Sequence, residues 1–269
     1  MRAMLEWRHP VRWQRALWAA LKWEQRPKLE GSAMSGDEIE LRGGQVNKVV
    51  RIGDTVRRTM AWDRAVAHQL LRHLEKHGFE GAPRFLGLDP LGREILTYLP
   101  TDLDHDADGF SDDQLTAAAA LLRRYHDATL DFTPVVRAGA EVLCHNDWTP
   151  ANTVFRNANP YGMIDFDTVA PGTRLWDVSY SAWTWLDLSD PAFSADEQLR
   201  RLELFCMGYD HPSCTVAHMA GYIPTRQAGR ARWARDRNMP EAEAWALKCM
   251  YWTVQNLSER VHRTGLPET

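Results

Sequence analysis

Along the first hundred residues the hydrophobic positions follow a strand pattern that one helix interrupts. β-branched residues cluster between glycine turns over residues 39–60, and apolar runs flank the turn at 89–92, as in antiparallel hairpins. The predicted strands cover residues 39–41, 48–52, 55–59, 84–88 and 94–99. Over residues 63–77 apolar residues recur at three- and four-residue spacing, which predicts a helix that Gly78 ends. The pattern predicts a five-stranded antiparallel sheet with one helix, complete by residue 100.

Beyond residue 100 the spacing of apolar residues becomes mainly helical. Ser111 is a candidate N-cap for the first of these helices. The predicted helices cover residues 113–129, 175–186, 195–209 and 241–261. We therefore expect an α+β protein with an N-terminal extension over residues 1–36, a sheet-containing lobe over 37–100 and a mainly helical lobe over 101–269.

Composition narrows the class of protein. The 269 residues are 44% hydrophobic and 25% charged, which is typical of a soluble globular chain. Lys and Arg total 32 against 36 Asp and Glu, a net charge of -4 that argues against a nucleic-acid partner. The four cysteines include no C-x-x-C pair, which favours reduced thiols and a cytoplasmic location over disulfides or structural zinc. Apolar runs are too short to span a membrane.

The first 28 residues combine basic and aromatic side chains. Seven Lys or Arg residues accompany two Glu residues, with four tryptophans between them. Such a segment could lie on an anionic membrane surface as a peripheral anchor. A short helix packed by its tryptophans on the body of the protein is the favoured interpretation, because amphipathic helices usually face a core. In a third interpretation the chain starts naturally at Met34 and the preceding residues are an extension.

Two polar clusters carry the candidate chemistry. Strands at residues 153–155 and 162–164 are predicted to pair as a hairpin, which brings Asn152 near Asp165. An amide oxygen and a carboxylate at one place suit Mg²⁺, which prefers oxygen ligands. Asp147 lies five residues before Asn152 and would face the same spot, where its carboxylate could accept a proton from a substrate hydroxyl.

These residues resemble a known family signature. His145-x-Asp147-x-x-x-x-Asn152, followed by Ile164-Asp165-Phe166-Asp167, is similar to the H-x-D-x-x-x-x-N and I-D-x-D motifs of aminoglycoside phosphotransferases and related small-molecule kinases. The resemblance extends over residues 39–263. Three segments, 41–44, 51–58 and 171–177, are similar to a subgroup that includes trifolitoxin immunity proteins.

The resemblance implies a protein-kinase-like two-lobed fold and a phosphotransferase activity. The expected reaction transfers the γ-phosphoryl group of ATP or GTP, with Mg²⁺, to a hydroxyl group of a small molecule. An alternative is a catalytically weak nucleotide-binding immunity or regulatory protein of the same fold. Asp147 would orient or deprotonate the acceptor, while Asn152 and Asp165 would hold Mg²⁺.

The nucleotide-binding residues also follow from the resemblance. Gly43 and Gly44 would bring backbone N–H groups over the phosphates, since residues without Cβ allow a close approach. Val56 would pack on the adenine, and Arg58, two residues on along the same strand face, would pair with phosphate. Backbone groups in the segment from Thr97 to Leu99 would read the adenine edge.

The chain departs from the family pattern at the phosphate-pairing position. Arg58 stands where kinases carry Lys, and the two side chains are not interchangeable. The helix at 63–77 offers no Glu to pair with it; His68 is the nearest polar group. We therefore expect the internal ion pair of kinases to be missing, which motivates the weakly catalytic alternative.

Other polar and aromatic residues are expected to be structural. His126, His145 and Asp177 are interpreted as satisfied buried groups, and Trp176, Trp183 and Trp185 as core. The five arginines from 226 to 237 have helical spacing, which is most often a solvated face.

Charge also bears on the acceptor. A polycationic aminoglycoside would need an acidic cleft, for which the candidates are Asp187, Asp190, Asp196, Glu197 and Glu203. The charged residues of 211–263 are mostly basic, however, with eight Lys or Arg against four Asp or Glu, so a strongly cationic acceptor is not favoured.

Overall fold

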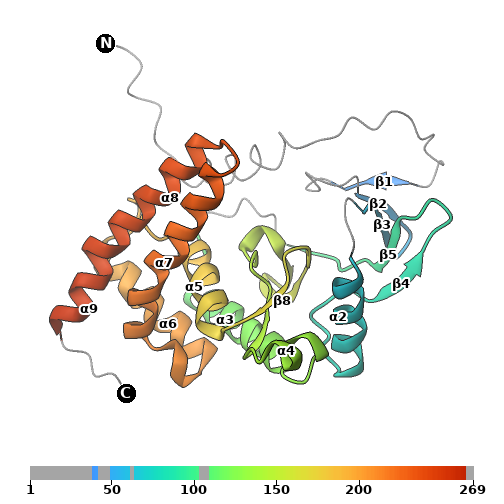
Figure 1. The fold of residues 1–269 in the computed structure, drawn as a ribbon, viewed down its shortest axis with the longest axis horizontal. Helices are drawn as coiled ribbons and strands as arrows, with labels where there is room; N and C mark the ends of the chain where they lie inside the picture. Colours follow the sequence, from blue (N-terminus) through green and yellow to red (C-terminus); the bar gives the residue numbers. More distant parts are fainter. Residues whose placement is uncertain (1–37, 42–48, 61–63, 103–108, 265–269) are drawn as a thin grey trace, which may run out of the picture.

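The sheet lies at one end of the protein and the helices fill the rest (Figure 1). The computed structural model describes residues 38–41, 49–60, 64–102 and 109–264. The sheet has five antiparallel strands in the order β1-β2-β3-β5-β4. Its strands are β1 (Ile39–Glu40), β2 (Val49–Ile52), β3 (Thr55–Arg58), β4 (Phe85–Leu88) and β5 (Glu94–Thr97). The sheet predicted from the hydrophobic pattern is confirmed.

Helix α2 (Ala65–Lys76) packs beside this sheet through the predicted apolar face. Its residues Leu70, Leu71 and Leu74 are fully buried. Gly78 follows the helix with a φ of 69°, and the next N–H, that of Phe79, donates to the Leu74 carbonyl. This left-handed glycine lets the chain leave the helix and satisfies one of its last carbonyls.

The remaining chain is mainly helical, as predicted. Its helices are α3 (Asp112–Asp127), α4 (Thr133–Ala138), α5 (Arg174–Trp185), α6 (Ala195–Tyr209), α7 (Val216–Arg235), α8 (Pro240–Thr253) and α9 (Glu259–Thr264). Ser111 caps α3 in a capping box with Gln114, which confirms the predicted start of that helix. The expected α+β class is therefore confirmed. The lobe limits at residues 37, 100 and 101 stay predictions, and residues 1–36 lie outside the described part of the chain.

Two helical regions differ from the prediction. Helix α7 was not among the predicted helices; only the helical spacing of its arginines from residue 226 was noted. Pro224 and two glycines weaken its apolar pattern. The helix predicted at 241–261 is interrupted by a π-helical turn at Val254–Ser258. Within the described ranges, none of the helices is long and apolar enough to cross a membrane.

Two small strand pairs lie between the sheet and the last helices. Strand β6 (Val142–Cys144) pairs with β9 (Ala170–Gly172), and β7 (Thr153–Arg156) pairs with β8 (Asn159–Met163). The second pair confirms the predicted hairpin, which turns through Asn157 and Ala158 with positive φ. One apolar core runs beneath these strands and includes the fully buried Trp148, Trp183 and Trp185.

Candidate active site

A buried carboxylate holds the loop that follows β6. Asp177, on α5, accepts hydrogen bonds from the backbone N–H groups of His145 (2.7 Å) and Asn146 (2.8 Å), and its Oδ2 lies 3.0 Å from His126 Nε2. Burial raises the pKa of Asp177, but the bonds from His126 and the His145 amide outweigh it and leave the pKa below its ordinary value. Asp177 is therefore an anion that anchors the loop, as expected.

Asp147 follows in this loop, and the side chains of Tyr180 and Asn152 donate hydrogen bonds to it. The Tyr180 hydroxyl donates to Asp147 Oδ1 at 3.0 Å, and the Asn152 amide donates to Oδ2 at 3.2 Å and to the Asp147 carbonyl at 2.7 Å. Burial and the nearby Asp147 charge raise the pKa of Tyr180 well above its ordinary value, so the phenol remains a donor. Asp147 is thus held as an oriented, half-buried carboxylate.

The hairpin brings Asp165 to the same place. The Ile164 N–H donates to the Asn152 carbonyl at 3.0 Å, so Asp165 begins directly beside Asn152. Asp165 has a φ of 67°, a left-handed conformation that is uncommon for a residue with a Cβ and concentrates at functional sites. Because the Asn152 amide nitrogen faces Asp147, its Oδ1 is the atom left to meet a cation. Two of the three predicted residues are in direct contact, and the third adjoins them.

Arg58, on β3, has an acidic partner on the neighbouring strand β5. Arg58 stands opposite Glu94 in the register of β3 and β5, with 3.7 Å between Arg58 Nε and Glu94 Oε1. Glu94 is fully buried and also lies 3.0 Å from Arg64 Nε and from His68 Nε2. The acid beside Arg58 therefore comes from the neighbouring strand, whereas the expectation concerned a glutamate on the helix.

Arg58 and Arg64 also reach the segment after β8. Arg58 lies 3.2 Å from Asp165 Oδ1 and pairs with Asp167, which also pairs with Arg64. Asp167 belongs to the I-D-x-D motif but had no predicted role. The network sets two guanidinium groups against the carboxylates of Glu94, Asp165 and Asp167, so one negative charge is left over when His68 is neutral. Together with the Asn152 oxygen, this donor set fits Mg²⁺.

The predicted nucleotide contacts occupy the sheet and the segment after it. Val56 is half-buried against the main core, opposite Leu96. The Thr97 N–H donates to the Arg84 carbonyl at 3.0 Å, so this N–H is engaged within the sheet. Gly43 and Gly44 lie outside the described residues.

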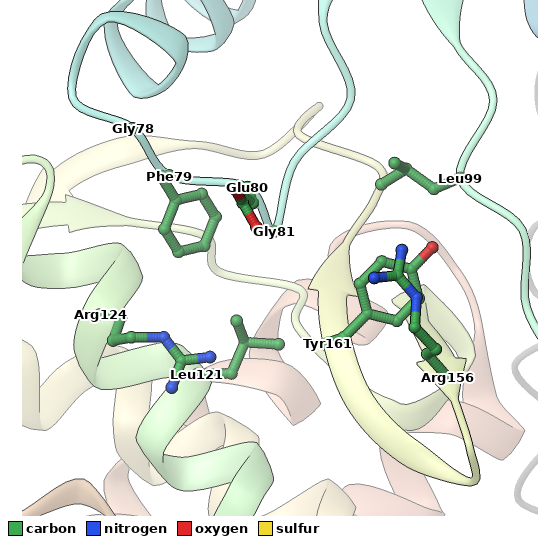
Figure 2. A pocket seen from close by; sticks show the side chains of 9 residues that line it. All are labelled: Gly78, Phe79, Glu80, Gly81, Leu99, Leu121, Arg124, Arg156 and Tyr161. Carbon is green, nitrogen blue, oxygen red and sulfur yellow. The ribbon is translucent and has the colours of Figure 1, made fainter.

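Leu99 lines a cavity of about 400 Å³ (Figure 2). Its walls are residues 78–81, Leu99, Leu121, Arg124, Arg156 and Tyr161. Asp147, Asn152 and Asp165 do not line this cavity. The cavity therefore includes one predicted nucleotide contact, Leu99, but none of the three acceptor and metal residues.

On the other side of Asp147, α5 and α7 present aromatic and basic side chains. The Arg226 guanidinium lies 3.9 Å from the Trp176 ring and 4.8 Å from the Tyr180 ring. Arg226 is 9% exposed, and burial lowers its pKa. The expected solvated face is therefore wrong for Arg226, which points into the helix contact. The Trp176 indole N–H donates to Asn146, beside the Asp147 loop, so Trp176 is also more than core filling.

Three of the five acidic residues proposed for a cation-binding cleft have partners of their own. Asp196 pairs with Arg260, and Glu197 pairs with Arg200 at 2.7 Å. Asp190 is buried, with its Oδ1 accepting from the Ala192 N–H. These acids are therefore engaged in local structure.

Comparisons with known proteins identify the family of the chain. A family model described as the phosphotransferase enzyme family matches residues 65–213. The trifolitoxin immunity protein of Rhizobium leguminosarum bv. trifolii is 33% identical over 169 residues, which make up 57% of this chain and 64% of that protein. The chain thus spans less than two thirds of the length of this curated relative.

Solved structures extend the similarity to the whole fold. A choline kinase from Cryptosporidium parvum Iowa II aligns with a TM-score of 0.58 and 13% identity, covering 86% of this chain and 91% of that chain. A choline/ethanolamine kinase family protein from Mesorhizobium loti aligns with a TM-score of 0.54 and 18% identity, covering 91% and 99%. The gentamicin complex of APH(2″)-IIa aligns with a TM-score of 0.54 and 15% identity, covering 83% and 93%. At these identities the likeness concerns the fold, and the predicted kinase-like fold is confirmed.

Proposed function

Because the chain belongs to the phosphotransferase enzyme family, we propose that it transfers the γ-phosphoryl group of ATP or GTP to a hydroxyl group of a small molecule. The observation that carries this proposal is the grouping of Asp147, Asn152 and Asp165. An oriented carboxylate beside two oxygen ligands is what a phosphoryl transfer to an alcohol requires.

Each of these residues has a distinct task in the proposed reaction. Asn152 Oδ1 and the Asp165 carboxylate would hold Mg²⁺. When bound, the ion neutralises charge on the nucleotide phosphates. The Tyr180 hydroxyl and the Asn152 amide orient the Asp147 carboxylate, whose oxygens are hydrogen-bond acceptors. An acceptor hydroxyl that donates to Asp147 would be oriented there and would pass its proton to that carboxylate as the new P–O bond forms and the bond from the γ-phosphorus to the departing nucleoside diphosphate breaks.

Arg58 would contribute on the nucleotide side. Its guanidinium is planar and can bind two phosphate oxygens at once. Asp165, Asp167 and Glu94 hold it in place, so the phosphate would share an arginine that is already oriented. We propose that Val56 and backbone groups of Thr97 and Leu99, other than the Thr97 N–H that already donates to Arg84, contact the base, together with Gly43 and Gly44 over the phosphates.

The basic groups near Asp147 bear on the acceptor class. Arg226 stacks on the aromatic rings of α5. Arg230 lies one turn further along α7, where burial lowers its pKa although Tyr180 and Asp147 oppose this. Two guanidinium groups here would repel a polycation. We therefore propose a neutral or anionic hydroxyl compound as the acceptor rather than an aminoglycoside.

The test is a phosphate-transfer screen with Mg-ATP and with Mg-GTP. The acceptors are aminoglycosides, macrolides, sugars, amino alcohols and nucleosides. Asp147→Asn should lower turnover by about 10²- to 10⁴-fold, the usual contribution of a general base, and leave nucleotide affinity nearly unchanged. Asp113→Asn, an exposed carboxylate on α3, is the matched control. Wild-type turnover in Asp147→Asn would refute the proposed role.

A second candidate is a nucleotide-binding immunity or regulatory protein. It is favoured by the similarity to a trifolitoxin immunity protein and by the arginine at the position of the kinase lysine. Mg-ATP binding by calorimetry, with no transfer to any acceptor of the panel, is the result expected for this candidate.

A further inference from the structure

Two histidines and one aspartate meet where α2 approaches the segment after α3. His73 lies in the last turn of α2 and His77 is the C-cap of that helix, so the two side chains, four residues apart, lie on the same side of it. Asp131 follows α3, and its two carboxylate oxygens lie 3.3 Å from His73 Nε2 and 3.4 Å from His77 Nε2. One donor atom from each residue lies within 4.8 Å of the others. The group is accessible, because His77 and Asp131 are solvent-exposed.

We propose that His73, His77 and Asp131 bind a divalent transition-metal ion of the zinc class, with water as the fourth ligand. Zinc ligands lie about 2.0–2.1 Å from the metal. Donor atoms at the corners of a tetrahedron of that size are about 3.3 Å apart. The two nitrogen-to-oxygen distances, each to a different oxygen of Asp131, are close to this spacing, and small side-chain shifts would bring both nitrogens and one oxygen around a single ion.

The donor set selects the class of ion. Imidazole nitrogens suit Zn²⁺, Co²⁺, Ni²⁺ and Cu²⁺, whereas Mg²⁺ requires oxygen ligands. Burial lowers the pKa of His73, and the neighbouring His77 lowers it further, although the Ala128 carbonyl and Asp131 oppose this. Coordination needs the neutral imidazole, because the metal takes the nitrogen lone pair that a proton would occupy.

One existing contact must change when the ion binds. His73 Nε2 lies 2.9 Å from the Ala128 carbonyl, which is its hydrogen-bond acceptor. On coordination the proton is carried by Nδ1 and the Nε2 lone pair goes to the metal. Giving up this bond costs part of the binding free energy, so we expect affinity in the micromolar range rather than that of a closed structural site.

The consequence of the site is a link between two parts of the fold. Helix α2 lies beside the sheet and close to α4 (Figure 1), whereas Asp131 belongs to the segment between α3 and α4. Five residues before His73, the same helix carries His68, which contacts Glu94 in the Arg58 network. An ion at this site would therefore tie the helix that supports the network to the helical part of the protein.

Titration calorimetry of the full chain with ZnCl₂, without nucleotide, tests the proposal. We expect one site that His77→Asn and Asp131→Asn each weaken by about tenfold or more. His218→Asn, which removes an exposed histidine from α7, should bind like the wild type. Zinc should also raise the thermal unfolding midpoint of the wild type but not that of His77→Asn. The unfolding transition of His77→Asn in this measurement shows that the variant is folded.

Two results would overturn the site. Equal zinc affinity in the wild type and both variants would place the ion elsewhere, and loss of affinity in His218→Asn would do the same. Co²⁺ gives a separate readout, since four-coordinate Co²⁺ absorbs strongly in the visible range and His77→Asn should abolish that band. Because no nucleotide or acceptor is present, these outcomes are independent of phosphoryl transfer.

Discussion

The buried carboxylate of Glu94 is expected to be among the most sensitive charged positions of the protein. Its side chain is fully buried and contacts Arg58, Arg64 and His68. Removing one partner of a buried ion pair costs about 3–5 kcal/mol, because the other charge loses its compensation. Asp167 still pairs with both arginines, so Glu94→Gln should cost about 3 kcal/mol, the lower end of this range.

Thermal unfolding followed by circular dichroism at pH 7 measures this loss. For a chain of this size, 1 kcal/mol shifts the midpoint by roughly 2–4 °C, so we expect Glu94→Gln to unfold roughly 6–12 °C below the wild type. Glu197→Gln is the control, because Glu197 pairs with Arg200 at the surface, where ion pairs contribute little. Equal midpoints for the two variants would show that Glu94 does not hold the arginine network together.

Three further predictions concern packing, the site and pH. Gly208→Ala should destabilise the fold by about 1–3 kcal/mol in chemical denaturation, since a Cβ there would lie 2.6 Å from a backbone oxygen of α3, whereas Gly221→Ala, with open space, should be neutral or stabilising. Tyr180→Phe should lower turnover by about tenfold at unchanged nucleotide affinity, because Asp147 loses an orienting hydrogen bond; unchanged turnover would contradict this. Burial lowers the pKa of His126, so the unfolded chain binds more protons as the pH falls below about 6.5 and stability falls with it; midpoints measured from pH 7 to 5 should fall less in His126→Asn.

Local patterns along the chain were sufficient for most elements of the fold. The strands of the sheet, helix α2 with its glycine stop, and the capped start of α3 each depend on neighbouring residues, so their signals are contained in short windows. Helix α7 was recognised only in part, because its Pro224 is tolerated by packing against α5 and α8 that no window shows.

The candidate site divides in the same way. Asp147, Asn152 and Asp165 lie within 19 residues of one another, and a single predicted hairpin brings them together, so their grouping could be inferred from the sequence. The identity of the acid beside Arg58 could not be inferred, since the helix residues nearest in the expected layout include no glutamate. It required the register that sets Glu94 opposite Arg58.

The sequence by itself determined the order of the elements, the motif residues and the excess of basic over acidic residues in 211–263. Only the tertiary structure decided which charges neutralise one another, that Arg226 turns inward onto Trp176, and that His73 and His77 meet Asp131. The physical reason is range. Backbone propensities and capping act over a few residues, whereas ion pairs and ligand clusters join side chains 36 to 109 positions apart, as in the contacts of Arg58 with Glu94 and with Asp167.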